Sequence, residues 1–217
     1  MNIRINGVLA FAGAIFPGLA MTVNLSVTVL DRDSTPVPNV AVWVEAAAIP
    51  PRDPGTAILD QQNVRFVPHI LVVQAGTSVE FPNNDEVAHH VYSFSKPNEF
   101  KLPIYKGEAH PPVIFDHPGV ATLGCNIHDH MLAFILVVET PVFTKTDANG
   151  IASLDGVPDG TASVRIWSPR IKDANDSLSQ EIEPHGSGEM AVGFTLQKKL
   201  RRPHDHDSDA LAWSEYD

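Results

Sequence analysis

The stretch that decides the fold of this chain is residues 119–138, GVATLGCNIHDHMLAFILVV. Two apolar runs, each with the length and composition of a β-strand, are joined there by a short polar loop. The loop begins at Cys125, the only cysteine among 217 residues, and carries His128 and Met131 at intervals of three residues. The sequence therefore predicts two strands whose connection can bring a thiol, an imidazole and a thioether together.

A second segment, residues 83–91 (NNDEVAHHV), supplies a further imidazole at His89 from an upstream predicted strand. Thiolate and thioether are soft ligands that favour Cu(I), whereas imidazole is accepted by both oxidation states of copper. Two histidines and one cysteine in a trigonal set, with a long axial methionine, describe the blue-copper electron-transfer centre. The combination predicts one copper ion bound by His89, Cys125, His128 and Met131.

Each candidate ligand also has a simpler interpretation. A single buried cysteine is more often a small hydrophobic residue than a ligand, and Met131 opens an apolar run and could belong to an ordinary core. The joint occurrence of the four residue types in two segments favours the copper interpretation. Adjacent strand residues face opposite sides, so only one of His89 and His90 can face the metal. His89 is preferred, His90 stays as the alternative, and His130 is expected to face solvent.

The two segments resemble the cupredoxins, in particular the amicyanin and plastocyanin group, whose ligand loop reads Cys-x-x-His-(short)-Met. In this resemblance Asn84-Asp85 is the turn before the upstream ligand, and residues 115–119 (FDHPG) are the bend before the strand that delivers the cysteine. Two features depart from the family: His90 stands where Asn is frequent, and the aromatic residue often found two positions before the cysteine is missing. The resemblance implies a Cu(II)/Cu(I) centre with His128 as the imidazole through which electrons leave.

Two other segments resemble the halves of a second fold, the carboxypeptidase regulatory-like, or transthyretin-like, sandwich. Residues 27–44 resemble its opening hairpin and residues 146–167 its second half. About a hundred residues separate the two, and the copper motifs lie between them. This order predicts that one domain is inserted in another, because surface turns tolerate insertions. A pairing of 27–30 with 163–167 in one sheet would favour the insertion, and a single enlarged sandwich is the alternative.

The predicted fold class is all-β: a cupredoxin Greek-key β-sandwich inserted in a second small β-sandwich. Short runs of alternating apolar residues, separated by many glycines and prolines, support this class. The expected organisation has five segments: a signal peptide (1–20), the first part of the small sandwich (21–59), the cupredoxin domain (60–140), the second part of the small sandwich (141–198) and a disordered acidic tail (199–217).

The N-terminus has the layout of a signal peptide. Arg4 precedes a short apolar stretch, and small residues place cleavage after Ala20. An uncleaved anchor is the alternative, but the stretch is shorter than the ~20 residues of a spanning helix, and the mature chain is expected to contain no membrane span. We therefore predict export to the periplasm. A lone thiol in an oxidising space is a liability unless a metal occupies it, so export agrees with a metal on Cys125.

The expected function is that of a periplasmic electron carrier, not an enzyme. The formal charge of −11 argues against nucleic acid as a partner, and the expected partner is a redox protein such as a c-type cytochrome or a periplasmic dehydrogenase. The layout also resembles proteins called methylamine utilization proteins. The alternatives are a copper-binding or copper-delivery protein and an envelope interaction module, neither with a redox circuit. The remaining histidines are scattered and indicate no catalytic copper.

Overall fold

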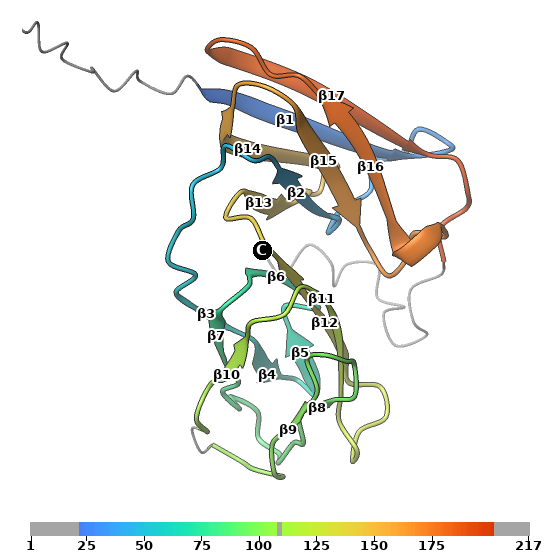
Figure 1. The fold of residues 1–217 in the computed structure, drawn as a ribbon. Helices are drawn as coiled ribbons and strands as arrows, with labels where there is room; N and C mark the ends of the chain where they lie inside the picture. Colours follow the sequence, from blue (N-terminus) through green and yellow to red (C-terminus); the bar gives the residue numbers. More distant parts are fainter. Residues whose placement is uncertain (1–21, 108–109, 202–217) are drawn as a thin grey trace, which may run out of the picture.

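The computed structural model describes residues 22–107 and 110–201 (Figure 1). In that part of the chain strands dominate, and the helical structure is one short turn, η1 (Ala174–Asp176). The predicted all-β class is confirmed. No helix among the described residues is long and apolar enough to cross a membrane. The predicted signal peptide lies outside the described residues, as do all but the first three residues of the predicted acidic tail.

Among the described residues, seventeen strands follow one another: β1 (Thr22–Asp31), β2 (Ala41–Glu45), β3 (Thr56–Ile58), β4 (Asp60–Gln62), β5 (Arg65–Val67), β6 (Ile70–Gln74), β7 (Thr77–Glu80), β8 (Tyr92–Ser93), β9 (Phe100–Lys101), β10 (Val113–Phe115), β11 (Gly119–Gly124), β12 (Leu132–Val138), β13 (Phe143–Lys145), β14 (Ile151–Pro158), β15 (Ala162–Trp167), β16 (Ser177–Ile182) and β17 (Gly188–Leu196).

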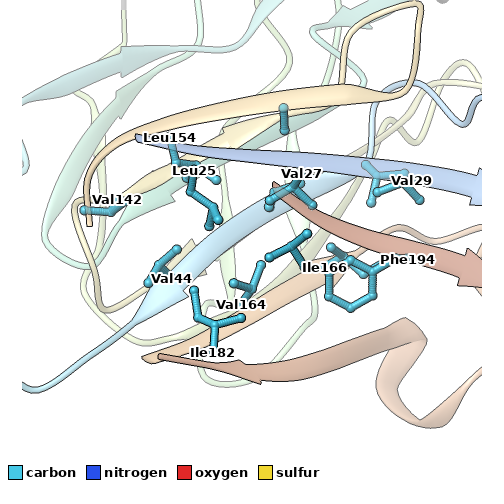
Figure 2. Close-up of a cluster of buried hydrophobic side chains, with 14 of the residues drawn as sticks. Leu25, Val27, Val29, Val44, Val142, Leu154, Val164, Ile166, Ile182 and Phe194 are labelled. Atoms are coloured by element: carbon cyan, nitrogen blue, oxygen red, sulfur yellow. The ribbon is translucent and has the colours of Figure 1, made fainter. Parts of the chain in front are cut away.

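The first sandwich is built from both flanks of the chain. One sheet has the order β14-β1-β17 and the other the order β13-β2-β15-β16. Strand β1 alternates, so that Leu25, Val27 and Val29 are buried while their neighbours are more exposed. These side chains meet Val164 and Ile166 of the opposite sheet in one core (Figure 2). Residues before 46 and after 141 therefore share a single hydrophobic core.

The pairing of residues 27–30 with 163–167 in one sheet, which would have favoured the insertion, is not made. Strand β1 pairs with β14, with Val27 opposite Ala152, and β15 pairs with β2, with Ile166 opposite Val42. The two segments lie in opposite sheets and meet through their side chains, because the apolar face of each covers the same core. Strands from the two flanks still pair with each other, because β1 and β2 precede the middle of the chain whereas β14 and β15 follow it. The limits of the five predicted segments stay predictions.

The second sandwich contains strands from the middle of the chain. Its sheets have the orders β10-β7-β3 and β6-β12-β11-β8-β9, and the hairpin β4-β5 lies beside them (Figure 1). The core between them includes Leu59, Phe81, Phe115, Leu123 and Ile135, all at most 3% exposed. Cys125 and Met131 belong to the same cluster. The candidate ligand loop is therefore anchored at one end of this core.

The two sandwiches share a third apolar cluster. Trp43 and Trp167 of the first sandwich pack with Ile70, Leu136 and Val138 of the second. Strand β12 thus has two buried faces, since its alternate residues belong to the core of the second sandwich and to this contact. A strand buried on both faces reads as a continuous apolar run. This explains why residues 132–138 do not alternate between apolar and polar.

Candidate metal centre

The ligand loop is held by the strands on either side of it. Strands β11 and β12 are antiparallel, and Gly124 lies opposite Leu132. The intervening residues must therefore turn back within a short distance. The backbone N–H of Met131 donates to the carbonyl of His128 at 3.0 Å and closes the end of this turn. Cys125 and His128 are thereby placed side by side above the core.

The upstream histidine lies in an irregular segment rather than in a strand. The sequence predicted a strand at His89, but the strand β8 contains only Tyr92 and Ser93. His89 is fixed by two backbone hydrogen bonds with Tyr105, each of 2.9 Å. The side chain of Asn83 donates to the carbonyls of Val87 and Tyr105, at 3.0 and 2.9 Å. The segment is irregular because it is bonded to Tyr105 and Asn83 instead of to a neighbouring strand over its whole length.

Three potential ligand atoms converge. The Nδ1 atoms of His89 and His128 are 3.1 Å apart, and Nδ1 of His128 is 3.8 Å from Sγ of Cys125. All three atoms lie within 4.8 Å of one another. With metal–nitrogen and metal–sulfur distances of about 2.0 and 2.3 Å, ligands at 120° are separated by about 3.5 Å (N to N) and about 3.7 Å (N to S). The two separations of 3.1 and 3.8 Å are close to these values.

Burial of the three residues is graded. His89 is fully buried and Cys125 is 4% exposed, whereas His128 is only half-buried. The imidazole of His128 therefore connects the cluster to the surface. The ring of His130 has its centroid 6.3 Å from that of His128, and its side chain is not among the three that converge.

His90 takes no part in the cluster through its side chain. Its ring packs on that of Tyr92, with centroids 5.2 Å apart, and its Nδ1 has no hydrogen-bond partner among the described residues. Burial, with a smaller contribution from the positive charge of Lys101, lowers the pKa of His90 below its usual value. Its backbone N–H donates to Sγ of Cys125 at 3.4 Å. The structure thus brings His89 to the other candidates and turns the ring of His90 away.

Met131 is 2% exposed and shares its hydrophobic cluster with Cys125. Both residues line a surface groove of ≈ 540 Å³, together with Tyr92 and Phe94. A thioether in this position can serve as the fourth, weak ligand of the predicted set. The groove shows that the sulfur side of the cluster, as well as the side of His128, lies near the surface.

Sequence reasoning missed one polar contact of the cluster. Asp85, interpreted only as part of a turn, places Oδ2 2.9 Å from Nε2 of His89. The same oxygen accepts the backbone N–H of Val64 at 2.6 Å. Partial burial of Asp85 disfavours its ionised form and acts to raise its pKa. The hydrogen bonds from Val64 and His89 outweigh this effect and hold the pKa of Asp85 below its usual value. The spacing of four residues between Asp85 and His89 was the signal available in the sequence.

Comparison with known proteins gives matches among solved structures alone. No family model and no curated protein matches the sequence. The structures that match include amicyanin and another cupredoxin. At the identities and TM-scores given below, these matches do not bear on which residues of this chain bind metal.

A reduced tryptophan-to-tyrosine mutant of amicyanin is 18% identical, with a TM-score of 0.36, over 45% of this chain and 98% of that one. An oxidised proline-to-alanine mutant of amicyanin is 21% identical, with a TM-score of 0.36, over 46% and 99%. A purple cupredoxin from Nitrosopumilus maritimus is 22% identical, with a TM-score of 0.33, over 39% and 99%.

Proposed function

We propose that this protein is a periplasmic type 1 copper protein that passes single electrons between redox partners and catalyses no reaction of its own. The observation that supports this most strongly is the convergence of Nδ1 of His89, Nδ1 of His128 and Sγ of Cys125 within 4.8 Å. Two imidazoles and one thiolate, with Met131 as a weak axial ligand, form the donor set of blue-copper centres. Copper bound there supplies a one-electron Cu(II)/Cu(I) couple.

The protein residues are arranged for such a couple. Imidazole is accepted by both oxidation states, and thiolate and thioether favour Cu(I), so one set can hold both. The backbone hydrogen bonds between His89 and Tyr105, and the one from His90 to Cys125, limit rearrangement of the ligands. The buried positions of His89 and Cys125 exclude water, while half-buried His128 offers the way to a partner at the surface.

The proposed location and partners depend on charge and on the predicted export signal. A single thiol in the periplasm is protected when it binds metal. The net charge of −11 favours a positively charged redox protein, because opposite charges speed transient encounters. We propose a c-type cytochrome or a periplasmic dehydrogenase as that partner, and the layout that resembles methylamine utilization proteins agrees with an amine dehydrogenase.

The test is to load the purified protein with Cu(II) and record its visible and electron paramagnetic resonance spectra. We expect an intense thiolate-to-copper charge-transfer band and a narrow copper hyperfine splitting. Cys125→Ser should abolish both, whereas the control His130→Ala should keep both. Colour that survives in Cys125→Ser would rule the site out.

A second measurement separates the electron carrier from a copper-binding protein. The reduced, copper-loaded protein is mixed with an oxidised c-type cytochrome in a stopped-flow instrument. Electron transfer that is fast at low salt and slows as salt rises supports the carrier. A spectroscopically normal site that binds copper, but transfers no electron to any cytochrome or dehydrogenase tested, would favour copper binding or delivery.

A further inference from the structure

We infer that Asp85 is a positioning residue for His89: its carboxylate sets the tautomer and orientation of the buried imidazole and, given the proposed copper site, favours the oxidised state of the metal. The inference rests on the contact between Oδ2 of Asp85 and Nε2 of His89, which are 2.9 Å apart. The side chains of the two residues are 11% and 0% exposed. Water therefore competes little for this hydrogen bond.

The contact decides which nitrogen of His89 carries the proton. An ionised carboxylate only accepts hydrogen bonds, so Nε2 of His89 must donate. In the neutral imidazole the other nitrogen, Nδ1, then has a free lone pair. That lone pair points to the place where His128 and Cys125 also direct their ligand atoms. Asp85 thus keeps His89 ready to bind metal before any metal arrives.

The carboxylate is itself held by two backbone N–H groups, and a third hydrogen bond holds the main chain of Asp85. The N–H of Val64 donates to Oδ2 at 2.6 Å, and the N–H of Glu86 donates to Oδ1 at 2.9 Å. The N–H of Asp85 donates to the side chain of Asn83 at 3.0 Å. These bonds join Asp85 both to its own loop and to the distant hairpin β4-β5. A carboxylate held in this way can orient an imidazole and not merely neutralise it.

Val64 makes its hydrogen bond from an unfavourable backbone conformation. Asn63 and Val64, at the tip of the hairpin β4-β5, have φ of +52° and +58°. Turns of this kind favour Asn-Gly, and a β-branched residue in the left-handed region is an outlier. The side chain of Val64 packs on the core of the second sandwich. The chain thus keeps a strained turn whose N–H is directed at Oδ2 of Asp85.

The same contact would act on copper held by the cluster. A carboxylate that accepts a hydrogen bond from a ligand histidine raises the basicity of that ligand. Its negative charge, close to a buried centre, favours Cu(II) over Cu(I) because the oxidised ion carries the larger positive charge. Removal of the charge of Asp85 should therefore weaken Cu(II) binding more than Cu(I) binding and raise the reduction potential.

The copper-dependent test compares Asp85→Asn with Asp116→Asn. Both remove one negative charge, but the side chain of Asp116 is 65% exposed and pairs with His117 rather than with a candidate ligand. We expect Asp85→Asn to lower the Cu(II)/Cu(I) affinity ratio by roughly tenfold, which is a rise of about 59 mV in potential for one electron. Asp116→Asn should leave the potential near that of the wild type. Equal shifts in the two variants, or none in Asp85→Asn, would overturn the inference.

A second test needs no copper. In the metal-free wild-type protein, long-range proton–nitrogen NMR correlations report the tautomer of each histidine. We expect His89 to carry its proton on Nε2, with slow solvent exchange, and Asp85→Ala to release this proton and mix the tautomers. A proton on Nδ1 of His89 in the wild type would contradict the inference. Because this experiment involves no copper, the positioning role can hold even if the copper-loading test of the proposed function fails.

Discussion

The backbone N–H of His90 donates to Sγ of Cys125 at 3.4 Å, so the two segments that carry the candidate ligands are joined by a main-chain hydrogen bond. A hydrogen bond donated to a thiolate stabilises its charged form. The main chain of His90 makes this connection, while its ring packs on that of Tyr92.

The first prediction separates the two adjacent histidines. His89→Ala should bleach the copper-loaded protein, since it removes one of the three converging ligand atoms. His90→Ala should keep the visible band, because alanine retains the backbone N–H that reaches Cys125. Absorption spectra of the two variants at equal copper loading provide the measurement. Bleaching by His90→Ala with colour retained in His89→Ala would assign the ligand to His90.

The second prediction concerns the turn before β14. Gly150 has φ of +70°, and a Cβ there would lie 2.6 Å from the carbonyl oxygen of Val29 and 3.0 Å from the backbone nitrogen of Val37. Those atoms belong to the backbone, and moving them costs free energy because the strands would have to shift. Gly150→Ala should therefore lower the free energy of unfolding by about 2 kcal/mol or more, measured by urea denaturation.

The matched control for Gly150 is Gly156→Ala. Gly156 has a similar φ of +76°, but a Cβ there would meet nothing within 4 Å. In Gly156→Ala the new side chain strains the backbone conformation but makes no close contact. The difference in the free energy of unfolding between the two variants therefore measures the contact with β1. An equal loss in the free energy of unfolding of the two variants would show that Gly150 does not press against Val29. The contact described between the two flanks at this turn would then be wrong.

The sequence predicted what local pattern and residue chemistry control. Strand β12 and the loop before it could be recognised because their apolar run and their Cys-x2-His-x2-Met spacing are continuous in the chain. The pairing of β1 with β14 and β17 could not be predicted from the sequence. Several strands have suitable patterns, and long-range packing selects among them. The hydrogen bond from the distant Val64 to the carboxylate of Asp85 could not be predicted either, because no local pattern reveals it.

The third prediction tests the contact between the sandwiches. Trp167 is 4% exposed, and its ring lies 5.7 Å, centroid to centroid, from that of Phe134 on β12. Trp167→Ala should destabilise the protein by about 3–5 kcal/mol and loosen the coupling between the two units. Calorimetry should then show one unfolding transition for the wild type and two for the variant.

Ile151→Ala is the control for Trp167→Ala. Ile151 is 40% exposed on β14, away from the contact between the sandwiches. Ile151→Ala should lower the free energy of unfolding much less than Trp167→Ala does. Calorimetry should still show a single unfolding transition. A single transition in Trp167→Ala, shifted only in temperature, would show that the apolar cluster around Trp43 and Trp167 does not couple the two sandwiches.

The last prediction is a pH dependence at Asp147, in the turn between β13 and β14. Its Oδ1 accepts the N–H of Ile151 at 2.8 Å and that of Asn149 at 2.9 Å. The hydrogen bond from Ile151 contributes most to a pKa below the usual value for this carboxyl. A pKa that is lower in the folded state than in the unfolded state means that ionised Asp147 stabilises the fold. This stabilisation is fully present above the unfolded-state pKa of about 3.9 and is lost as the pH falls through the lower folded-state value.

Asp147→Asn should accordingly be less stable than the wild type at neutral pH, and the gap between them should narrow as the pH falls below about 4. Urea denaturation at pH 7 and at about pH 3 measures the two gaps. Asp155→Asn removes the same charge from an exposed position on β14 and should show a smaller gap at neutral pH. A gap for Asp147→Asn that stays constant between the two pH values would mean that the charge of Asp147 does not stabilise this turn, and that an amide oxygen accepts the N–H groups of Asn149 and Ile151 equally well.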